Sequence, residues 1–500
     1  MTNHRDVLIV GAGLSGIGAA YRLQEMAPQK TYAVLEGRES IGGTWDLFRY
    51  PGIRSDSDMY TLSFPFKPWT HHQAIAGGAD IRQYLVETAQ EFGIDKQINY
   101  GRKVTAASWD TDSALWTVTT TLTDGSHEVW TTNFLYLCSG YYSYDQGYTP
   151  DFPGIEKFQG TIVHPQFWPE DLDYTGKKVV VIGSGATAVT LLPSMADQTE
   201  HITMLQRSPT YIVAQPGTDP FANFFYRTKL MPKKAVHWFA RKRYAIMTVG
   251  SYLLCRAFPK TSRKLLTGLA AASTPKDFDR KHITPKYAPW DQRLCVIPGG
   301  DLWRSIREGK ASIVTDHIRE FTPTGIALES GENLDADIIV TATGLTLVAL
   351  GDIALDVDGR KINPHELFNY KGLMFNGLPN LAWVIGYTNA SWTLRANLSW
   401  KYVADYLNYL DKNGYDYGMP DPIGQPGTAT PVLDLDSGYI QRASELLPQS
   451  GATKPWKVRQ NWFLDTWDAQ HTDIEEAMVF GNATASRESV EKESPDVLAS

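Results

Sequence analysis

The sequence of 500 residues is too long for one hydrophobic core, so its length predicts two or three domains. Its hydrophobic fraction of 43% is typical of a globular protein, and its net charge of −8 argues against nucleic-acid binding. Three separated cysteines exclude a disulfide framework and a zinc site, and no apolar run is long enough to span a bilayer. Because strand-like sequence begins almost at Met1, we expect no signal peptide and a cytoplasmic protein. We also expect no metal site.

The N-terminal segment has the order of elements found in dinucleotide-binding folds. Residues 6–10 form an apolar run typical of a buried parallel strand, residues 17–23 fit a helix, and residues 32–35 fit a second strand. A glycine-rich turn at residues 11–16 joins the first strand to the helix, and Glu36 follows the second strand. This order predicts a βαβ unit whose helix N-terminus offers free N–H groups to phosphates.

Each fixed residue of this unit has a physical role. Gly11 makes the tight turn, Gly13 lets the backbone approach a pyrophosphate, and Gly16 lets helix and strand pack closely. Glu36 can accept hydrogen bonds from a ribose. We therefore predict that these four residues bind a dinucleotide cofactor.

A second glycine-rich segment follows Glu36. Gly43 precedes Thr44 and Trp45, and glycine at this point suits a loop that passes close over a flavin. We predict that these three residues contact the cofactor. Asp56 stands among small polar residues. From these residues alone, the preferred interpretation of Asp56 is an ordinary acidic residue in a turn.

The next part of the chain predicts an antiparallel meander and then a linker. Residues 80–92 fit a helix, and residues 141–151 fit a linker. Val104, at the start of the meander, is a candidate cofactor contact. The expected strands are residues 104–109, 115–122, 128–132 and 134–140.

A second dinucleotide-binding unit is predicted downstream. Residues 177–182 fit a strand that leads into a turn, and Ala188 replaces the third glycine of the pattern. The second strand, residues 201–206, ends at Arg207 and Ser208. An acid there would repel a 2′-phosphate, whereas a guanidinium can hold one, so we expect NADPH to be preferred over NADH. An ordinary surface arginine is the alternative. The candidate turn residues are Gly183, Ser184, Gly185, Ala186 and Thr187.

Between the two glycine turns lies an aromatic loop, residues 158–169. Prolines at 165 and 169 predict neither a helix nor a strand there. A loop in this position can sense both cofactors. Its candidate functional residues are Phe158, Gly160, His164, Trp168 and Pro169.

An aromatic and basic segment, residues 216–293, changes the character of the chain. We interpret it as helices inserted between two halves of the second unit. Basic residues interleaved with aromatic ones also suit a membrane surface, so a weak membrane-surface association through this segment stays an open alternative.

The C-terminal part returns to buried strands. Residues 336–344 read as a strand ending in Ala-Thr-Gly, where the chain crosses back to the first lobe, and residues 380–386 read as a last strand. Asn389, Trp392 and Arg395 follow as candidate walls of a substrate pocket. From about Thr484 the composition predicts disorder.

Two segments resemble the fingerprints of the type I Baeyer–Villiger monooxygenases. Residues 158–169 match F-x-G-x-x-x-H-x-x-x-W-P, and residues 42–56 match G-G-x-W-x-x-x-x-Y-P-G-x-x-x-D at every fixed position. The resemblance covers nearly the whole chain and is strongest to the subgroup of ethionamide-activating monooxygenases. It implies FAD and NADPH as cofactors.

The resemblance also implies an active site. In that family an acid at the position of Asp56 lies beside the flavin, and Arg293 fits the active-site arginine at the end of the inserted helices. Gln292 stands where the family usually has a lysine, which puts more of the NADPH preference on Arg207. His164 is expected to link the lobes and not to act as an acid or base. An interdomain salt bridge is the alternative for Arg293.

Together these observations predict an α/β protein with two Rossmann-like domains and a helical insertion. We assign residues 1–140 and 375–500 to FAD binding, residues 141–215 and 294–374 to NADPH binding, and residues 216–293 to the insertion. The expected activity is oxidation of a small-molecule ketone to an ester or lactone with O₂ through a C4a-peroxyflavin, with sulfides as further substrates. Alternatives are a flavin-containing N- or S-monooxygenase, a flavin-dependent reductase, and a non-catalytic dinucleotide-binding partner.

Overall fold

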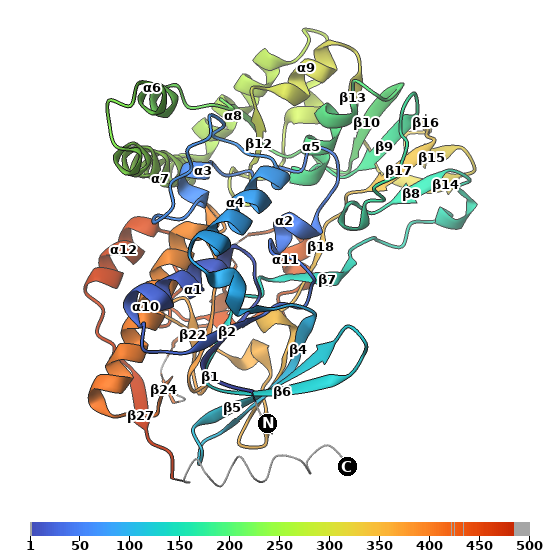
Figure 1. The fold of residues 1–500 in the computed structure, drawn as a ribbon. Coiled ribbons are helices and arrows are strands. Elements are labelled where there is room, and N and C mark those ends of the chain that lie inside the picture. Colours follow the sequence, from blue (N-terminus) through green and yellow to red (C-terminus); the bar gives the residue numbers. More distant parts are fainter. Residues whose placement is uncertain (1–2, 422, 425, 434, 485–500) are drawn as a thin grey trace.

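The computed structural model describes residues 3–421, 423–424, 426–433 and 435–484. The segment after Thr484 that composition predicts to be disordered lies outside the described residues. Figure 1 shows two lobes, each built on a sheet, with a group of helices beside them. The predicted α/β class with two dinucleotide-type units is confirmed.

The first lobe contains a nine-stranded sheet. Its order is β20-β19-β4-β5-β6-β1-β2-β3, and β23 also pairs with β6. Strand β2 and the last four residues of β1 and of β6 are apolar and buried, as expected for parallel strands covered on both faces. The strands are β1 (Asn3–Val10), β2 (Tyr32–Leu35), β3 (Ile98–Asn99), β4 (Arg102–Asp110), β5 (Leu115–Leu122), β6 (His127–Leu137), β19 (Ala354–Val357), β20 (Arg360–Lys361) and β23 (Leu381–Trp383).

Strand β6 corrects one sequence prediction. Residues 128–132 and 134–140 were expected as two strands, but one strand runs through Asn133 to Leu137. It pairs antiparallel with β5 and parallel with β1, so it carries the meander directly into the parallel sheet. The alternating pattern of residues 128–132 and the apolar run that follows it therefore belong to one strand, whose neighbouring strands differ along its length.

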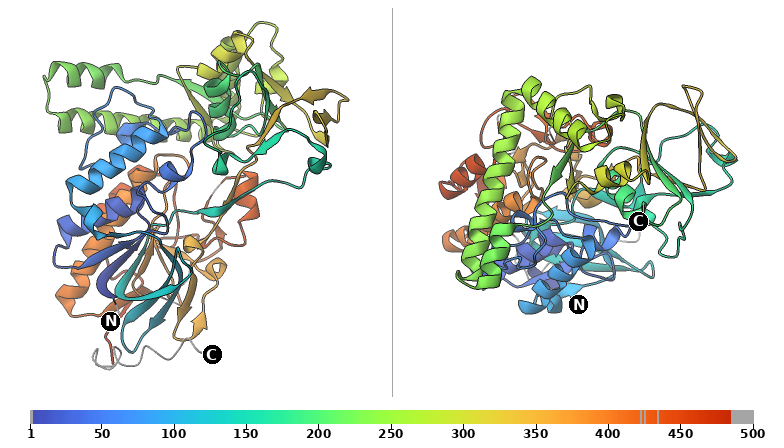
Figure 2. Two further views of the ribbon diagram at one scale, coloured as in Figure 1. Left: turned by 45° about the vertical axis from the view of Figure 1, so that its right-hand side comes forward. Right: turned by 90° about the horizontal axis from the view of Figure 1, so that it is seen from above.

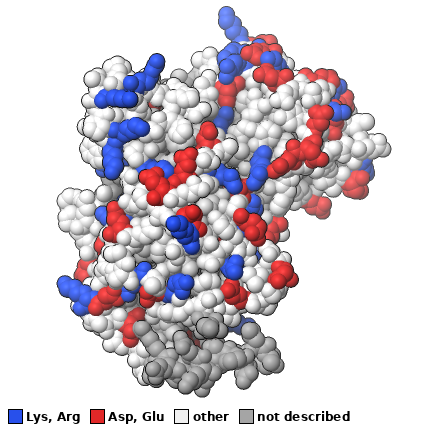
Figure 3. Space-filling model, in the orientation of Figure 1, with Lys and Arg blue, Asp and Glu red and all other residues white. Residues whose placement is uncertain are grey.

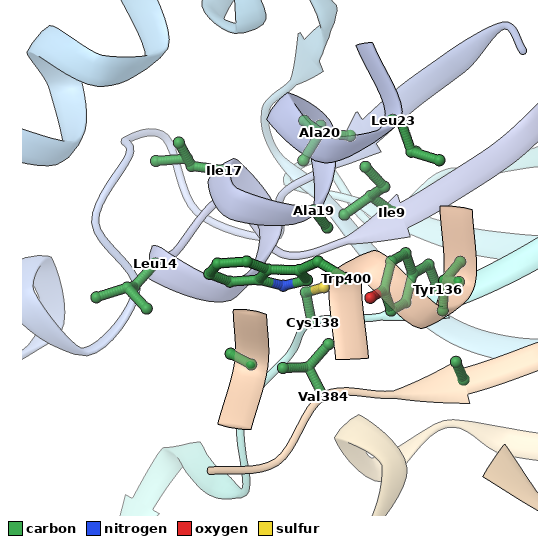
Figure 4. Packing of buried hydrophobic residues seen from close by; sticks show 14 of the residues in the cluster. Ile9, Leu14, Ile17, Ala19, Ala20, Leu23, Tyr136, Cys138, Val384 and Trp400 are labelled. Carbon is green, nitrogen blue, oxygen red and sulfur yellow. The ribbon is translucent and has the colours of Figure 1, made fainter. Parts of the chain in front are cut away.

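Helices α1 (Leu14–Met26) and α10 (Trp392–Asn413) pack together on this sheet. Figure 4 shows the ring of Trp400 lying against α1 in the core. Glycine at position 18 makes this contact possible, because a Cβ there would lie 2.2 Å from the Trp400 ring. The smaller helices α2 (Thr44–Leu47) and α3 (Met59–Leu62) and the longer α4 (Gly78–Glu91) cover the same lobe.

The second lobe contains a parallel five-stranded sheet of order β13-β10-β9-β17-β8. Helix α5 (Ala186–Met195) leads out of the glycine turn and packs with α9 (Asp301–Arg307). A small antiparallel sheet lies beside it, formed by β14 (Ile318–Thr322), β15 (Gly325–Leu328) and β16 (Asn333–Asp335). The main strands are β8 (Thr161–Val163), β9 (Lys178–Ile182), β10 (His201–Gln206), β13 (Ala311–Thr315) and β17 (Ile338–Thr341).

The aromatic loop corrects a second prediction. No strand was expected in residues 158–169, yet β8 forms the edge of the five-stranded sheet. The strand ends before the first proline, and Pro165 begins the 3₁₀ turn Pro165–Phe167, where its missing N–H costs nothing.

Two antiparallel strands join the lobes. The expected linker contains β7 (Tyr142–Gly147), which pairs with β18 (Leu345–Leu347) on the returning chain. After β17 the chain passes through β18 to β19 in the nine-stranded sheet, so it crosses back after the Ala-Thr-Gly strand as expected.

The inserted segment is helical, as predicted. It contains α6 (Pro220–Thr228), α7 (Lys233–Ala257) and α8 (Pro259–Ser273), and Figure 2 shows α7 running along one side of the molecule. Its ends meet because β11 (Ile212–Gln215) pairs in parallel with β12 (Cys295–Pro298). Among the described residues, no helix has the length and apolarity required to cross a membrane.

The C-terminal part wraps around the first lobe. Its helices are α11 (Gly438–Arg442) and α12 (Trp462–Gln470), and α12 packs on α10. Short antiparallel pairs complete it: β21 (Asn369–Tyr370) with β22 (Met374–Phe375), β24 (Tyr417–Pro420) with β27 (Met478–Gly481), and β25 (Thr430–Pro431) with β26 (Gln449–Ser450).

Candidate active site

A cavity of about 540 Å³ lies between the two lobes. It is bounded by the first glycine turn, the loop before α2, the start of α5, and residues of β7 and β18, the two strands that join the lobes. The first glycine turn and the start of α5, which follows the second glycine turn, both line this space, so the two units can present their cofactors to one cavity. The sequence-predicted residues that line it are Gly11, Gly13, Glu36, Gly43, Thr44, Trp45, Asp56, Val104, Ala186, Thr187, Arg293 and Trp392.

The first turn is glycine-rich for steric reasons. Gly11 has φ +104°, and a Cβ there would lie 2.8 Å from the carbonyl oxygen of Cys138. A Cβ on Gly16 would lie 1.9 Å from the oxygen of Gly11, so Gly16 brings α1 close to the strand without itself lining the cavity. Gly13 is the N-cap of α1, no side chain caps this helix, and its first N–H groups are free to bind a phosphate.

Glu36 stabilises this turn through hydrogen bonds to its backbone. Its two carboxylate oxygens accept hydrogen bonds from the backbone N of Ala12 at 2.6 Å and of Arg38 at 2.9 Å. The side chain is buried, and burial raises its pKa despite these bonds. Glu36 therefore holds the turn as well as facing the cavity, where a ribose hydroxyl can reach it.

Asp46 is a buried residue that the sequence reasoning missed. It is 1% exposed and binds Arg38 at 2.7 Å, Arg82 at 2.7 Å and Arg49 at 3.2 Å. Burial alone would raise its pKa, but hydrogen bonds from Ser40, Arg38 and Arg82 lower it. These bonds fix the loop that carries Gly43 and Thr44 into the cavity. An acid next to Trp45, with arginines nearby in sequence, was the available signal.

Arg293 and Asp56 meet in the cavity, although they are far apart in sequence. Nε of Arg293 lies 3.0 Å from Oδ2 of Asp56, and a terminal nitrogen donates to Oδ1 at 3.1 Å. This bidentate pair fixes the plane of the guanidinium. The Asp56 carboxylate raises the pKa of Arg293 further, so the cation is permanent.

Aromatic side chains surround this pair. Tyr141 stacks on Trp392 with ring centroids 5.4 Å apart, and its hydroxyl lies 3.0 Å from that of Tyr142. Both tyrosines line the cavity, and Tyr439 of α11 also lies near Arg293. A linker was predicted at residues 141–151, which gives no signal for Tyr141 or Tyr142, and nothing in the sequence links Tyr439 to Arg293.

The second glycine turn has the same steric logic. Gly183 has φ +137°, and a Cβ there would lie 2.3 Å from the oxygen of Ala342. Gly185 caps α5 without a side-chain hydrogen bond, and Ala188 is fully buried where the pattern has its third glycine. Gly183, Ser184 and Gly185 lie outside the cavity lining, and the turn reaches the cavity through Ala186 and Thr187.

Arg207 and Ser208 are exposed at the end of β10, outside the cavity. The hydroxyl of Ser184 donates to the backbone oxygen of Ser208 at 3.1 Å, so the turn and this strand end are neighbours. Among the described residues, Arg207 forms no ion pair. Its guanidinium is thus available for an anion near the second turn.

The aromatic loop contacts the linker between the lobes. A Cβ on Gly147 of β7 would lie 2.0 Å from the His164 ring, and Gln166 donates to the backbone oxygen of Ser143 at 2.9 Å. Burial lowers the pKa of His164. The histidine lies outside the cavity lining, which fits a linking role.

The other residues of this loop are packed beside β8. Phe158 is buried, and a Cβ on Gly160 would lie 2.4 Å from the oxygen of Asp337. Trp168 packs against the core of the second lobe, and the oxygen of Pro169 accepts a bond from Leu172 at 3.3 Å.

The comparisons with known proteins agree with this arrangement. The model of the flavin-binding monooxygenase-like family matches residues 4–241. The FAD-containing monooxygenase EthA of Mycolicibacterium smegmatis is 51% identical over 478 residues, which are 95% of this chain and 96% of that protein. The chain belongs to the FAD-containing monooxygenases.

Solved structures show that this monooxygenase shares its fold with a steroid monooxygenase and a cyclohexanone monooxygenase. A steroid monooxygenase bound to NADP aligns with a TM-score of 0.73 and 24% identity, covering 96% of this chain and all of that one. A cyclohexanone-bound cyclohexanone monooxygenase aligns with a TM-score of 0.74 and 21% identity over 96% of this chain.

Two predicted pocket residues of the monooxygenase lie elsewhere. Asn389 is buried, and its side-chain amide donates to the backbone oxygen of Gln460 at 2.7 Å, away from the cavity lining. Arg395 pairs with Asp465 at 3.0 Å and stacks over Tyr387 at 4.4 Å. Both side chains are held by residues at or just before α12, so neither lines the cavity that Trp392 faces.

Proposed function

We propose that this family member is an FAD- and NADPH-dependent Baeyer–Villiger monooxygenase. It uses O₂ to convert ketones to esters or lactones and also oxidises sulfides. The bidentate Arg293–Asp56 pair at the cavity carries the proposal. Ketone oxidation of this kind develops negative charge on oxygen, and a fixed cation in a water-poor site stabilises such charge by several kcal/mol.

The residues around the cavity fit the two cofactors. Two uncapped helix N-termini suit two pyrophosphates, and before each of them stands one glycine, Gly11 or Gly183, whose Cβ would clash with the backbone. Bound FAD and NADPH together supply hydride transfer and the activation of O₂. The residues that would hold FAD are Gly11, Gly13, Gly16, Glu36, Gly43, Thr44, Trp45, Asp56 and Val104. Those that would hold NADPH are Gly183, Ser184, Gly185, Ala186, Thr187, Arg207 and Ser208.

The remaining residues orient the reactants and exclude water. Arg293 provides the fixed positive charge, and Asp56 holds its plane without itself transferring a proton. The stacked rings of Tyr141 and Trp392 form an apolar wall beside the pair. Phe158, Gly160, His164, Trp168 and Pro169 couple the two lobes through β7. The division into FAD-binding residues 1–140 and 375–500, NADPH-binding residues 141–215 and 294–374, and an insertion at 216–293 is part of this proposal.

The proposed setting is the cytoplasm, with access to a membrane surface. All three cysteines are buried and free, which suits a reducing compartment. The composition of the insertion supports weak association with a membrane surface.

A product screen tests the function. The purified protein is given NADPH, isotopically labelled O₂ and a panel of ketones, sulfides and amines, and the products are identified by mass spectrometry. We expect yellow protein and esters that carry one labelled oxygen for each NADPH consumed. Products limited to sulfoxides or N-oxides would favour a flavin-containing N- or S-monooxygenase. Anaerobic turnover with an organic acceptor would favour a reductase, and colourless protein a non-catalytic partner.

A further inference from the structure

Helix α7 has apolar side chains on its inner and on its outer side. Its inner side packs Ala245 and Val249 against Tyr387 and Ala390, two residues that line the cavity. A helix on the surface of a globular protein normally has a polar outer side. Here, more than half of the exposed large apolar side chains in the described part of the molecule lie on α6–α8 and their connections. Those on α7 are Trp238, Phe239, Ile246, Met247, Leu253 and Leu254.

These exposed side chains follow one another along α7. Phe239, Ile246 and Leu253 follow each other at heptad spacing, and Trp238 and Leu254 extend the row to about 24 Å along the helix. Leu265 and Leu269 of α8 are also exposed, one turn apart. We call this set of eight residues the outer apolar face. No described residue covers it.

The same segment carries only positive charge. Between Pro220 and Lys276 the sequence has twelve Lys and Arg residues and no Asp or Glu, although the whole chain has a net charge of −8. Arg241 is buried, and Arg243 and Arg256 pair with Asp219 and Asp291. Within the described residues, the other nine form no ion pair. Figure 3 shows this region, at the upper left, as largely white and blue.

Helix α12 continues the face on the first lobe. Nζ of Lys242 lies 4.8 Å from the ring centroid of Trp462, so the two helices are neighbours there. Phe463, Leu464 and Trp467 of α12 are exposed. Aromatic rings and lysines together are typical of a protein surface at the boundary between lipid and water.

The charge decides between the possible occupants of this face. A second copy of the chain would bring two strongly positive segments together, which opposes association. A nucleic acid would match the charge but offers nothing to bury rows of Leu, Ile and Met. An anionic bilayer provides both a negative surface and an apolar layer below it.

We propose that the outer apolar face and the lysines and arginines around it dock this protein reversibly on an anionic lipid bilayer. The inference deepens the proposed membrane association and names its surface and its lipid. The helices lie in the plane of the interface, since none is able to cross it. The inner side of α7 then separates the bilayer from the cavity wall at Tyr387 and Ala390.

Vesicle flotation of the full-length protein tests the proposal. The probes are vesicles of phosphatidylcholine alone and vesicles with half phosphatidylglycerol. We expect binding to the anionic vesicles that falls at least tenfold between low and high salt, and little binding to the neutral ones. The variant Ile246→Glu/Leu254→Glu should lose most binding, whereas Leu446→Glu, which replaces an equally exposed leucine elsewhere, should bind like the wild type.

A second variant tests the charge without changing the apolar face. Lys260→Gln/Lys264→Gln should weaken binding by about fivefold for each charge, while Lys96→Gln in the first lobe should not. No vesicle binding by the wild type, salt-insensitive binding, or equal losses in the controls would overturn the proposal. So would sedimentation of the wild type as a dimer that Ile246→Glu/Leu254→Glu dissociates. Oxygenation is measured separately in vesicle-free buffer, so failure of the proposed activity is distinguishable from failure of docking.

Discussion

At the scale of single residues, two arginines illustrate how surroundings set a role. Arg293 is held in one plane by Asp56 inside the cavity, so its guanidinium suits a negative charge whose position is fixed. Arg207 is exposed and forms no ion pair within the described residues, so its guanidinium can turn to a mobile phosphate group. The same side chain thus suits a reaction centre in one place and cofactor selection in the other.

Arg207→Ala tests cofactor selection. Loss of one charge-assisted phosphate contact costs roughly 1.5–3 kcal/mol, or about ten- to a hundredfold in affinity. We expect the KM for NADPH to rise by this factor and the KM for NADH to stay nearly unchanged. Arg319→Ala, which removes an exposed arginine from β14, is the matched control. Equal effects of Arg207→Ala on both cofactors would contradict the phosphate contact.

At the scale of elements, β7 and the aromatic loop form the joint between the lobes. His164 fills the space that Gly147 leaves open, and burial disfavours its charged form. We therefore expect this ring to transmit position between the lobes and not to exchange protons during turnover.

His164→Gln tests this role. We expect kcat to fall while the ratio of variant to wild-type rates stays constant across the range from about pH 6 to 9, because no titration is removed. His201→Gln, at the start of β10, should leave kcat near the wild-type value. A pH limb present in the wild type and absent from the His164 variant would show that the ring takes part in proton transfer.

A buried histidine on helix α7 should make the stability of the protein depend on pH. His237 is buried on its inner side next to Tyr60, and burial together with Arg241 lowers its pKa to about 3. The unfolded chain binds a proton there below about pH 6.5, whereas the folded protein stays neutral until about pH 3. Stability from this residue is therefore complete above the unfolded pKa and is lost as pH falls.

His237→Phe should remove this loss. Between about pH 7.5 and 5 the wild type should lose about 2 kcal/mol more than the variant, seen as a smaller decrease of Tm in the variant. His317→Gln, at an exposed position, should follow the wild type. Parallel Tm curves for wild type and His237→Phe would show that the ring is protonated, or solvated, in the folded state.

Local patterns predicted the main strands of the two glycine-turn units, and most of the short strands elsewhere were not predicted because they depend on tertiary neighbours. The expected strands 32–35, 115–122 and 201–206 have the observed bounds, because continuous or alternating apolar runs depend only on burial. Strand β8 was missed because an edge strand needs only three residues and a partner. Resemblance placed Arg293 and Asp56 at the active site, whereas the positions of Asp46, Tyr141 and Tyr439 depend on contacts between distant segments.

At the scale of the whole molecule, two similar units face one cavity. Each unit contributes an uncapped helix N-terminus. The Arg293–Asp56 pair lies in the cavity between the units and joins two residues that are far apart in the sequence. The central claim is that this pair makes the cavity an oxygenating site. If so, the arginine is required for oxygen insertion and is not required for cofactor binding or NADPH oxidation.

The most direct measurement is ester, hydrogen peroxide and NADPH followed in one reaction with Arg293→Ala. We expect FAD to remain bound and NADPH oxidation to continue, with ester at background and the consumed NADPH recovered as hydrogen peroxide. Arg293→Lys should restore part of the ester, because it keeps the charge and loses the planar fork. Ester formation by Arg293→Ala at near wild-type yield per NADPH would contradict the account.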